Sequence, residues 1–223
     1  MSISENLKFF KNELPEKVSL VAVSKTKPLE NLQEAYTFGQ RIFGENKIQE
    51  MTEKWQLLPK DIEWHMIGHV QTNKVKYMAP YVSLIHGVDR LKVWSEIHKQ
   101  ALKNDRIIPC LLQVYIADEE TKFGFSADEI KEIITHNTLL EFPNAKVVGL
   151  MGMASNVASE SQIRTDKVRA EFKGLRKLFD SANEMGCDFE VLSMGMSGDY
   201  TIGIEEGSNM VRVGSKIFGS RNY

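Results

Sequence analysis

Short, nearly continuous apolar runs alternate along this chain with longer amphipathic segments. Runs such as Leu20-Val-Ala-Val23 and Val147-Val-Gly-Leu-Met151 are typical of strands covered on both faces, as in a parallel sheet. The segments between such runs place apolar residues at three- and four-residue spacing, which is typical of helices. A repeated strand–helix unit of this kind predicts the α/β class.

The pattern predicts eight strands and several helices. The expected strands are Ser19–Ser24, Arg41–Phe43, Glu63–Ile67, Ser83–Gly87, Ile107–Ile116, Lys146–Met151, Glu190–Ser193 and Met210–Val213. The clearest expected helices are an opening helix at about residues 3–14, Ala127–His136 with Ser126 as its N-cap, and Lys167–Met185.

Eight strands with intervening helices predict a single (β/α)8 TIM barrel over residues 1–223, with the opening helix added at its N-terminal side. An open doubly wound sheet is the alternative. Its dinucleotide-binding version is disfavoured, because no Gly-x-Gly-x-x-Gly follows an early strand.

Composition excludes several classes of protein. Hydrophobic residues make up 42% of the chain, charged residues 26%, and the net charge is only -2, which indicates a folded globule. The 28 basic and 30 acidic residues are interspersed, so we expect no nucleic-acid surface. The sequence has no apolar run long enough for a membrane helix and no signal segment, so we expect a cytoplasmic protein that does not bind membranes.

In a barrel, functional side chains gather where the strands end at their C-terminal side. Lys25 follows the first expected strand directly. Partial burial there would lower the pKa of its amine and make it a nucleophile. The alternative is an ordinary solvated lysine.

Two turns rich in small residues follow the last two expected strands. One is Ser193–Asp199 and the other begins at Gly214-Ser215. Backbone N–H groups in such turns can converge on an anion, and TIM barrels often bind phosphate at this place. The alternative is ordinary turn chemistry.

Other motifs do not support a catalytic or metal site. Gly195-Met-Ser-Gly-Asp199 has Asp where a nucleophile elbow requires Gly. His65 and His69 lack the clustered carboxylates or cysteines of a metal site. We therefore expect no metal and assign no catalytic residue.

Five ordered motifs resemble the pyridoxal phosphate homeostasis protein family, a single-domain relative of the alanine racemase barrel. They are Val21-Ala-Val-Ser-Lys-Thr-Lys-Pro28, Phe43-Gly-Glu-Asn46, His65-Met-Ile-Gly68 with Gln71-Thr-Asn-Lys74, Gly149-Leu-Met151, and Arg212-Val-Gly-Ser-Lys-Ile-Phe-Gly219. The resemblance runs from about residue 18 to the end of the chain.

This resemblance implies that the chain binds pyridoxal 5′-phosphate (PLP). Lys25 matches the lysine that forms the internal aldimine with the cofactor. Ser197 matches the serine that binds the phosphate, and Gly214 with Ser215 matches the second phosphate-binding turn. Asn46 matches an asparagine near the cofactor.

The resemblance also implies weak catalysis. Arg212 matches the residue that faces the pyridine nitrogen, and a guanidinium there disfavours the ring proton that carbanion chemistry needs. Met153 stands where racemases have a ring-stacking histidine, and Lys122 stands where they have an arginine. We expect no second domain after Tyr223 to supply the racemase tyrosine.

The first hypothesis is therefore a monomeric, non-catalytic protein that buffers PLP or delivers it to apo-enzymes. The alternative is a PLP-dependent amino-acid racemase or lyase whose second base is Tyr200, Lys27 or Lys122. A third hypothesis is a phosphate-ligand barrel without a covalent cofactor.

Overall fold

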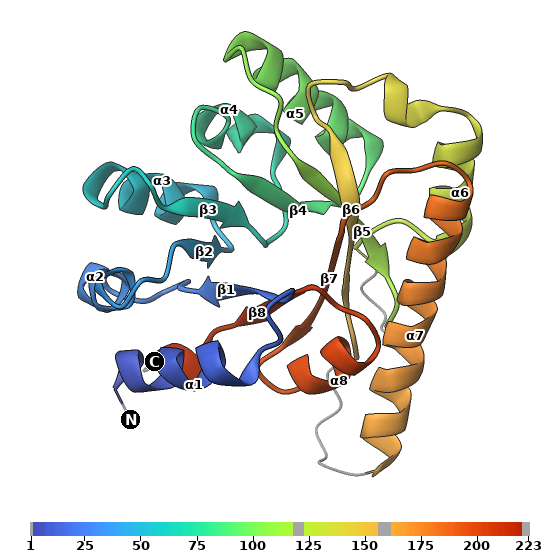
Figure 1. Ribbon diagram of the computed structural model, residues 1–223. Helices are drawn as coiled ribbons and strands as arrows, with labels where there is room; N and C mark the ends of the chain where they lie inside the picture. Colours follow the sequence, from blue (N-terminus) through green and yellow to red (C-terminus); the bar gives the residue numbers. More distant parts are fainter. Residues whose placement is uncertain (1, 118–122, 156–161, 220–223) are drawn as a thin grey trace.

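The strands of this protein close into a parallel barrel in which each strand pairs with the next in sequence (Figure 1). The computed structural model describes residues 2–117, 123–155 and 162–219. β8 pairs with β1 through partners such as Ser19 with Met210, which closes the barrel. The strands are β1 Ser19–Val23, β2 Ile42–Glu45, β3 Glu63–Met66, β4 Leu84–Val88, β5 Cys110–Tyr115, β6 Val147–Met153, β7 Val191–Met196 and β8 Met210–Val213. The barrel prediction is confirmed.

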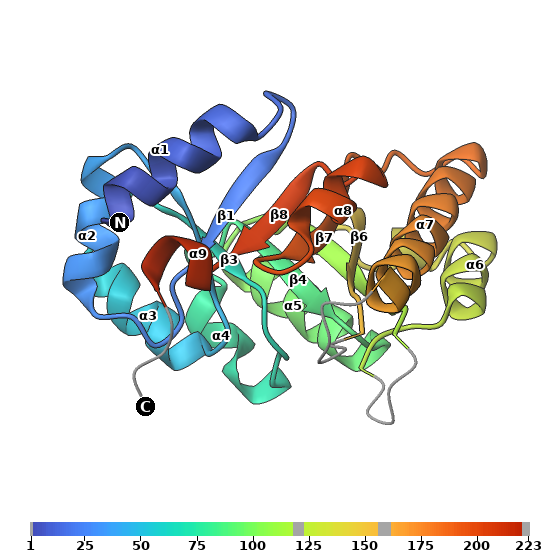
Figure 2. The same cartoon turned by 90° about the horizontal axis from the view of Figure 1, so that it is seen from below.

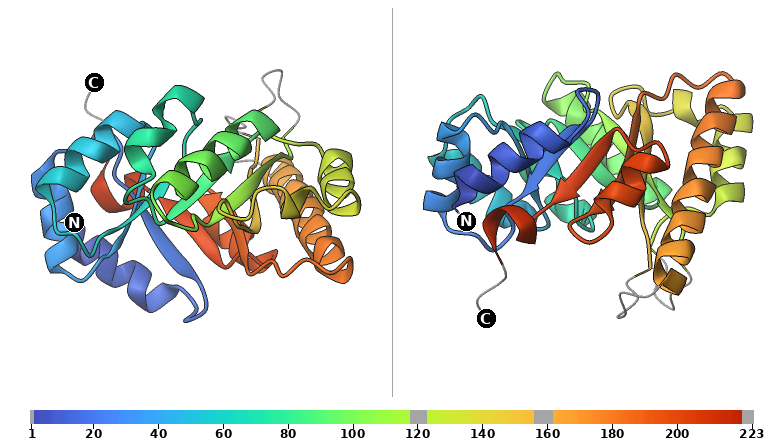
Figure 3. Two further views of the ribbon diagram at one scale, coloured as in Figure 1. Left: turned by 90° about the horizontal axis from the view of Figure 1, so that it is seen from above. Right: turned by 60° about the horizontal axis from the view of Figure 1, so that its bottom comes forward.

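Helices surround the barrel, and Figures 2 and 3 show that α6 and α7 lie side by side. The α-helices are α1 Ile3–Glu13, α2 Leu29–Thr37, α3 Ile48–Leu57, α4 Val75–Met78, α5 Leu91–Lys103, α6 Ala127–Thr135, α7 Gln162–Glu184, α8 Tyr200–Glu205 and α9 Ser215–Phe218. The 3-10 turns are η1 Thr72–Lys74 and η2 Thr138–Leu140. No helix in the described ranges is both long and apolar enough to cross a bilayer.

Sequence signals at the helix ends explain where α1 and α6 begin. Ser2 and Ser126 each form a capping box, in which the hydroxyl accepts from the N–H three residues later and a glutamate reaches back. The Ser126 cap was predicted. α1 ends at Glu13 rather than at residue 14, because Pro15 pushes Leu14 into an extended conformation.

Two apolar layers hold the fold together. Inside the barrel, a small apolar cluster consists of Val21, Leu84, Leu111, Met151 and Met210. A much larger cluster lies between the strands and the helices. Because successive side chains on a strand alternate between these layers, each strand fixes which residues face the inside of the barrel.

Several expected strand ends were wrong. β5 begins at Cys110 rather than Ile107, because Pro109 has no N–H to donate to a ladder. β6 continues to Met153 rather than ending at Met151, and β7 continues to Met196 rather than ending at Ser193. β2 likewise continues through Gly44 to Glu45. The strands therefore bring several predicted site residues to the barrel rim.

Candidate functional site

One cavity of about 590 Å³ at the C-terminal ends of the strands brings together all seven residues predicted to bind the cofactor. These residues are Lys25, Asn46, Met153, Ser197, Arg212, Gly214 and Ser215. The other described lining residues are Val23, Lys27, Ile67, Gly68, His69, Gln113, Phe123, Met196, Gly198 and Gly219. No aspartate or glutamate occurs among the described lining residues, so the cavity suits an anion.

Lys25 reaches this cavity from the turn after β1, two residues past the last residue of the strand, Val23. Val21 lies in the inner core, and Val23 lines the cavity above it. These two valines are two apart on β1, so their side chains share one side of the strand. The same spacing carries Met151 to Met153 on β6.

The turns after β7 and β8 contact each other directly. The backbone N–H of Gly214 donates to Ser197 Oγ at 3.1 Å. Gly195 has φ +97°, and a Cβ there would lie 2.9 Å from Tyr200 Cα, so this close approach requires glycine. These contacts place the hydroxyl of Ser197 and the turn at Gly214 on one side of the cavity.

Arg212 on β8 is buried, with 3% of its surface exposed, and it lines the floor of the cavity. Its Nη1 donates to Ser193 O at 2.9 Å and to Ser193 Oγ at 2.7 Å, and its Nη2 donates to Gly152 O at 3.0 Å. Burial lowers the pKa of Arg212 to about 10, so the group stays cationic at neutral pH. The barrel wall fixes the orientation of this cation.

A chain of hydrogen bonds continues from Arg212 into the barrel. Ser193 Oγ lies 3.2 Å from His86 Nδ1, and His86 Nε2 lies 3.1 Å from His65 Nδ1. Burial lowers the pKa of His65 to about 3 and that of His86 well below 6.5, so both rings are neutral at pH 7. The hydroxyl of Ser193, which accepts from Arg212, therefore links the guanidinium to the two neutral imidazoles.

The two histidines that the sequence places four residues apart have different partners. His65 points into the barrel, whereas His69 Nδ1 lies 2.8 Å from the buried carboxylate of Asp89. Within the described residues, no three His, Cys, Asp or Glu side chains are grouped as metal ligands.

Three further cavity residues, His69, Gln113 and Phe123, were given no cofactor role from the sequence, and His69 was considered there only as a strand-end residue and a metal ligand. Gln113 Nε2 donates to Phe123 O at 3.1 Å, and the Phe123 ring lies 4.9 Å from the His69 ring. The available signal was position: His69 follows the end of β3, and Gln113 is a polar residue in a strand of apolar neighbours.

The three residues considered as a second base lie in different places. Tyr200 is buried on α8, where its ring packs 5.4 Å from that of Phe10, and it is not among the described cavity residues. Lys27 lines the cavity, but its Nζ donates to the carbonyl oxygens of Phe218 and Gly219, each at 3.0 Å. Lys122 lies outside the described residues.

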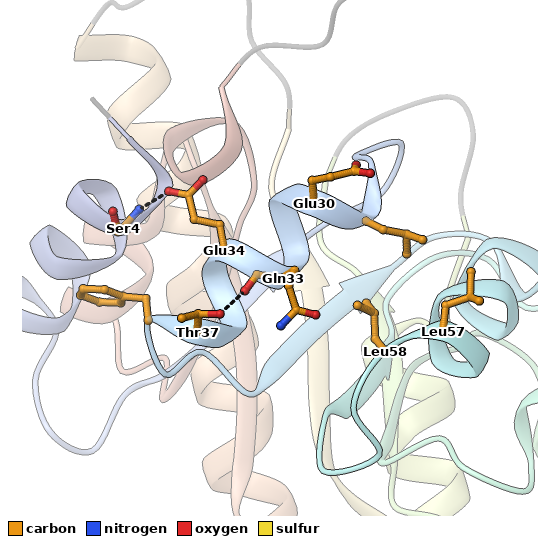
Figure 4. A pocket seen from close by; sticks show the side chains of 9 residues that line it. Ser4, Glu30, Gln33, Glu34, Thr37, Leu57 and Leu58 are labelled. Carbon is orange, nitrogen blue, oxygen red and sulfur yellow. Dashed lines mark hydrogen bonds between the residues drawn. The ribbon is translucent and has the colours of Figure 1, made fainter.

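A second hollow, of about 760 Å³, lies on the flank of the barrel, where α2 faces the end of α3 (Figure 4). Its described lining contains the carboxylates of Glu30 and Glu34 and no lysine, arginine or histidine. An acidic lining does not suit a phosphate group. The cavity at the strand ends is therefore the candidate site.

Comparisons with known proteins agree with this fold. Residues 1–222 match the family described as alanine racemase, N-terminal domain. The pyridoxal phosphate homeostasis protein of Aquifex aeolicus is 41% identical over 206 residues, which is 92% of this chain and 87% of that protein. The protein of the same name in Escherichia coli K12 is 35% identical over 218 residues, 94% of this chain and 88% of that protein.

Two solved structures have folds similar to that of this chain. PipY of Synechococcus elongatus, solved with PLP bound, has a TM-score of 0.84 and 28% identity, and the match covers 98% of this chain and 100% of PipY. Alanine racemase of Clostridium difficile has a TM-score of 0.80 at 17% identity, and the match covers all of this chain but 57% of the racemase. The racemase likeness concerns the fold alone.

Proposed function

We propose, from the premise that this chain belongs to the alanine racemase N-terminal domain family and, within it, to the pyridoxal phosphate homeostasis proteins, that it binds PLP and serves in PLP homeostasis. The observation that carries the proposal is the single cavity that gathers Lys25, Arg212 and the two turns after β7 and β8. The bound PLP of the similar PipY structure supports the same cofactor.

The chemistry of the lining residues fits this cofactor. A phosphate dianion needs hydrogen-bond donors, and the hydroxyls of Ser197 and Ser215 supply them in a cavity whose described lining holds no carboxylate. The aromatic ring needs apolar contact, which Met153 and Val23 provide.

Each residue has one task in this proposal. When bound, PLP supplies an aldehyde that condenses reversibly with a lysine amine. Lys25 presents that amine from the end of a rigid strand. Arg212, held by three hydrogen bonds, would disfavour a proton on the ring nitrogen through its positive charge. Asn46 and Met153, which line the cavity, would contact the ring.

We further propose that the protein does not catalyse amino-acid chemistry. Racemisation needs a second base that faces the reacting carbon. Tyr200 is packed against Phe10, and the amine of Lys27 donates to backbone carbonyl oxygens at the end of α9. A homeostasis role then consists of holding PLP and releasing it to apo-enzymes, by a monomer in the cytoplasm.

The test is a visible absorbance spectrum of the PLP-loaded protein, before and after borohydride reduction, followed by peptide mass mapping. We expect a reducible band and a pyridoxyl adduct on Lys25. Lys25→Ala should remove both while the circular dichroism spectrum stays unchanged, and the matched control Lys27→Ala should keep the adduct on Lys25. A band that persists in Lys25→Ala would refute the assignment of the lysine.

Catalysis is tested separately. We expect no interconversion of L- and D-alanine by the loaded protein above the rate of free PLP. Turnover that requires Lys25 would contradict the non-catalytic proposal and favour the racemase alternative.

A further inference from the structure

A buried lysine lies behind the strand end that carries Lys25. Lys54 on α3 is only 6% exposed, and its Nζ donates to Ser24 O at 2.8 Å, to Glu45 Oε1 at 2.7 Å and to Glu50 Oε1 at 2.7 Å. Lysine is rarely buried to this degree, and a buried charge requires partners of this kind. Neither Lys54 nor Glu45 is among the described residues that line the PLP cavity.

The same cluster holds the backbone on both sides of Lys25. On the N-terminal side, Ser24 accepts from Lys54 through its carbonyl, and its hydroxyl donates to Glu45 Oε1 at 2.7 Å. On the C-terminal side, the N–H of Thr26 donates to Glu50 Oε1 at 2.6 Å. Lys25 is therefore the centre of a tripeptide whose two neighbours are both attached to one group of charged residues.

The backbone at Thr26 needs such support. Thr26 has φ +63°, a left-handed conformation that is unfavourable for a β-branched residue. Glu50 accepts the hydrogen bond of this same residue. The contact holds the chain in the turn that follows Lys25.

The cost of the cluster argues against a role in stability alone. Glu45 is fully buried, and its Oε2 has no hydrogen-bond partner among the described residues. Apolar side chains of similar size would fill such a space at no desolvation cost. What the charged groups supply, and apolar groups could not, is the set of hydrogen bonds to Ser24 and Thr26.

We propose that Lys54, Glu45 and Glu50 are positioning residues that fix the backbone of Ser24–Thr26 and so set where the Lys25 amine enters the cavity. They act from the helix side of β1, while Lys25 faces the barrel mouth. This inference rests on the proposed function, because Lys25 is assigned there as the residue that reacts with PLP.

Glu50 offers the sharpest test. Glu50→Ala removes the acceptor for Thr26, whereas Glu50→Gln keeps an acceptor oxygen. We expect the rate of covalent PLP attachment, followed by absorbance, to fall about tenfold or more in Glu50→Ala and to recover largely in Glu50→Gln. Asp128→Ala, which breaks an exposed ion pair on α6, is the matched control and should leave the rate unchanged.

Two further measurements separate positioning from collapse of the cavity. Binding of 4-deoxypyridoxine 5′-phosphate, which has no aldehyde, should change less than the attachment rate in Glu50→Ala. Equal losses in both would overturn the proposal. In the protein without PLP, amide hydrogen exchange at Thr26 should accelerate in Glu50→Ala but not in Asp128→Ala.

The attachment rate also distinguishes failure of the proposed function from failure of the positioning role. If the wild-type protein forms no covalent adduct, the proposed function fails, whatever Glu50 does. If the adduct forms equally fast in wild type and Glu50→Ala, the positioning role alone is wrong. Lys54→Met provides a second variant, and its thermal midpoint shows whether the fold survives without the buried charge.

Discussion

Arg212 holds Ser193 with two hydrogen bonds, one to the carbonyl oxygen at 2.9 Å and one to the hydroxyl at 2.7 Å. Ser193 is thereby the junction between the cation on the cavity floor and the two buried histidines beneath it. These two hydrogen bonds, the one to Gly152 O and the electrostatic attraction of Asp199 together compensate the buried guanidinium of Arg212. Its charge remains available to a ligand in the cavity.

Substitution of Arg212 by lysine should weaken PLP binding. A lysine has one nitrogen and cannot donate to both Ser193 and Gly152 in the fork geometry of a guanidinium. Each carbonyl left without its partner costs about 1–3 kcal/mol, so we expect lower stability and a PLP dissociation constant raised about tenfold or more. Fluorescence titration measures the constant. Unchanged affinity in a folded Arg212→Lys variant would show that the guanidinium does not contact the cofactor.

The buried histidines should make the protein less stable in acid. Their folded pKa values are lowered, to about 3 for His65, whereas in the unfolded chain both titrate near 6.5. Below pH 6.5 the unfolded state therefore binds more protons, and the free energy of unfolding falls by about 1.4 kcal/mol per pH unit for each histidine. This loss continues until the pH reaches the folded pKa.

Over part of this pH range, Glu45 changes the free energy of unfolding with pH in the opposite direction. Burial raises its pKa from 4.5 to about 7, so between these values the folded state holds the extra proton and stability falls as the pH rises. We therefore expect the unfolded state to bind about one proton more than the folded state between pH 4.5 and 6.5, and about two more just below pH 4.5. The free energy of unfolding should rise with pH in proportion to this difference. Urea unfolding across this range measures it.

The variant His86→Gln tests how much one buried histidine contributes to the pH dependence of the free energy of unfolding. It should reduce the pH slope by about one proton between pH 4.5 and 6.5. The matched control is His136→Gln, which removes an exposed histidine at the C-cap of α6. Parallel stability curves for wild type and His86→Gln would mean that His86 is not the buried neutral group described here.

Ser197→Ala should discriminate between ligands with and without phosphate. The variant loses the hydroxyl that joins the two turns at Gly214. A lost hydrogen bond to a charged group costs about 1.5–3 kcal/mol, so the PLP dissociation constant should rise about 10- to 150-fold. Binding of pyridoxal should change much less. Ser126→Ala, which removes the cap of α6, controls for loss of a hydroxyl elsewhere, and equal effects on both ligands in Ser197→Ala would exclude a phosphate contact.

The sequence predicts the barrel well, because apolar strand patterns and helix caps are local signals. The core of every strand was found, and the Ser126 cap of α6 appears as expected. The errors fall at the ends of elements, at glycines and a proline in the strands and at the start of α7, which begins at Gln162 rather than Lys167. β7 passes through Gly195 to Met196, which pairs with Arg212 of β8, and periodicity within one segment does not report such pairing.

The candidate site was predicted where it lies on the inward side of strand ends, as for Lys25 and Arg212. Two other features could not be predicted from the sequence. Helical spacing does not indicate that Lys54, among the lysines of this chain, is the one turned toward Glu45. Nor does it show that His65 and His86, on neighbouring strands, meet inside the barrel. Both depend on how neighbouring elements pack against each other, which the spacing within one element does not report.

Gly68 supports the cavity by letting the chain at Asn46 approach closely. A Cβ at Gly68 would lie 2.5 Å from Asn46 O and 2.7 Å from Asn46 Cα, and these backbone atoms cannot move without shifting the rim. We expect Gly68→Ala to cost about 1–3 kcal/mol of stability through overpacking and to weaken PLP binding at the same time. Thermal unfolding and PLP titration measure the two effects.

The matched control is Gly174→Ala in the middle of α7. An added Cβ there meets no atom within 4 Å, and alanine is the better helix former. This variant should therefore gain about 0.5–1 kcal/mol and leave PLP binding unchanged. If Gly68→Ala were as stable as wild type and bound PLP equally well, the contact with Asn46 would not shape the cavity, because the backbone would have absorbed the methyl group without moving the site.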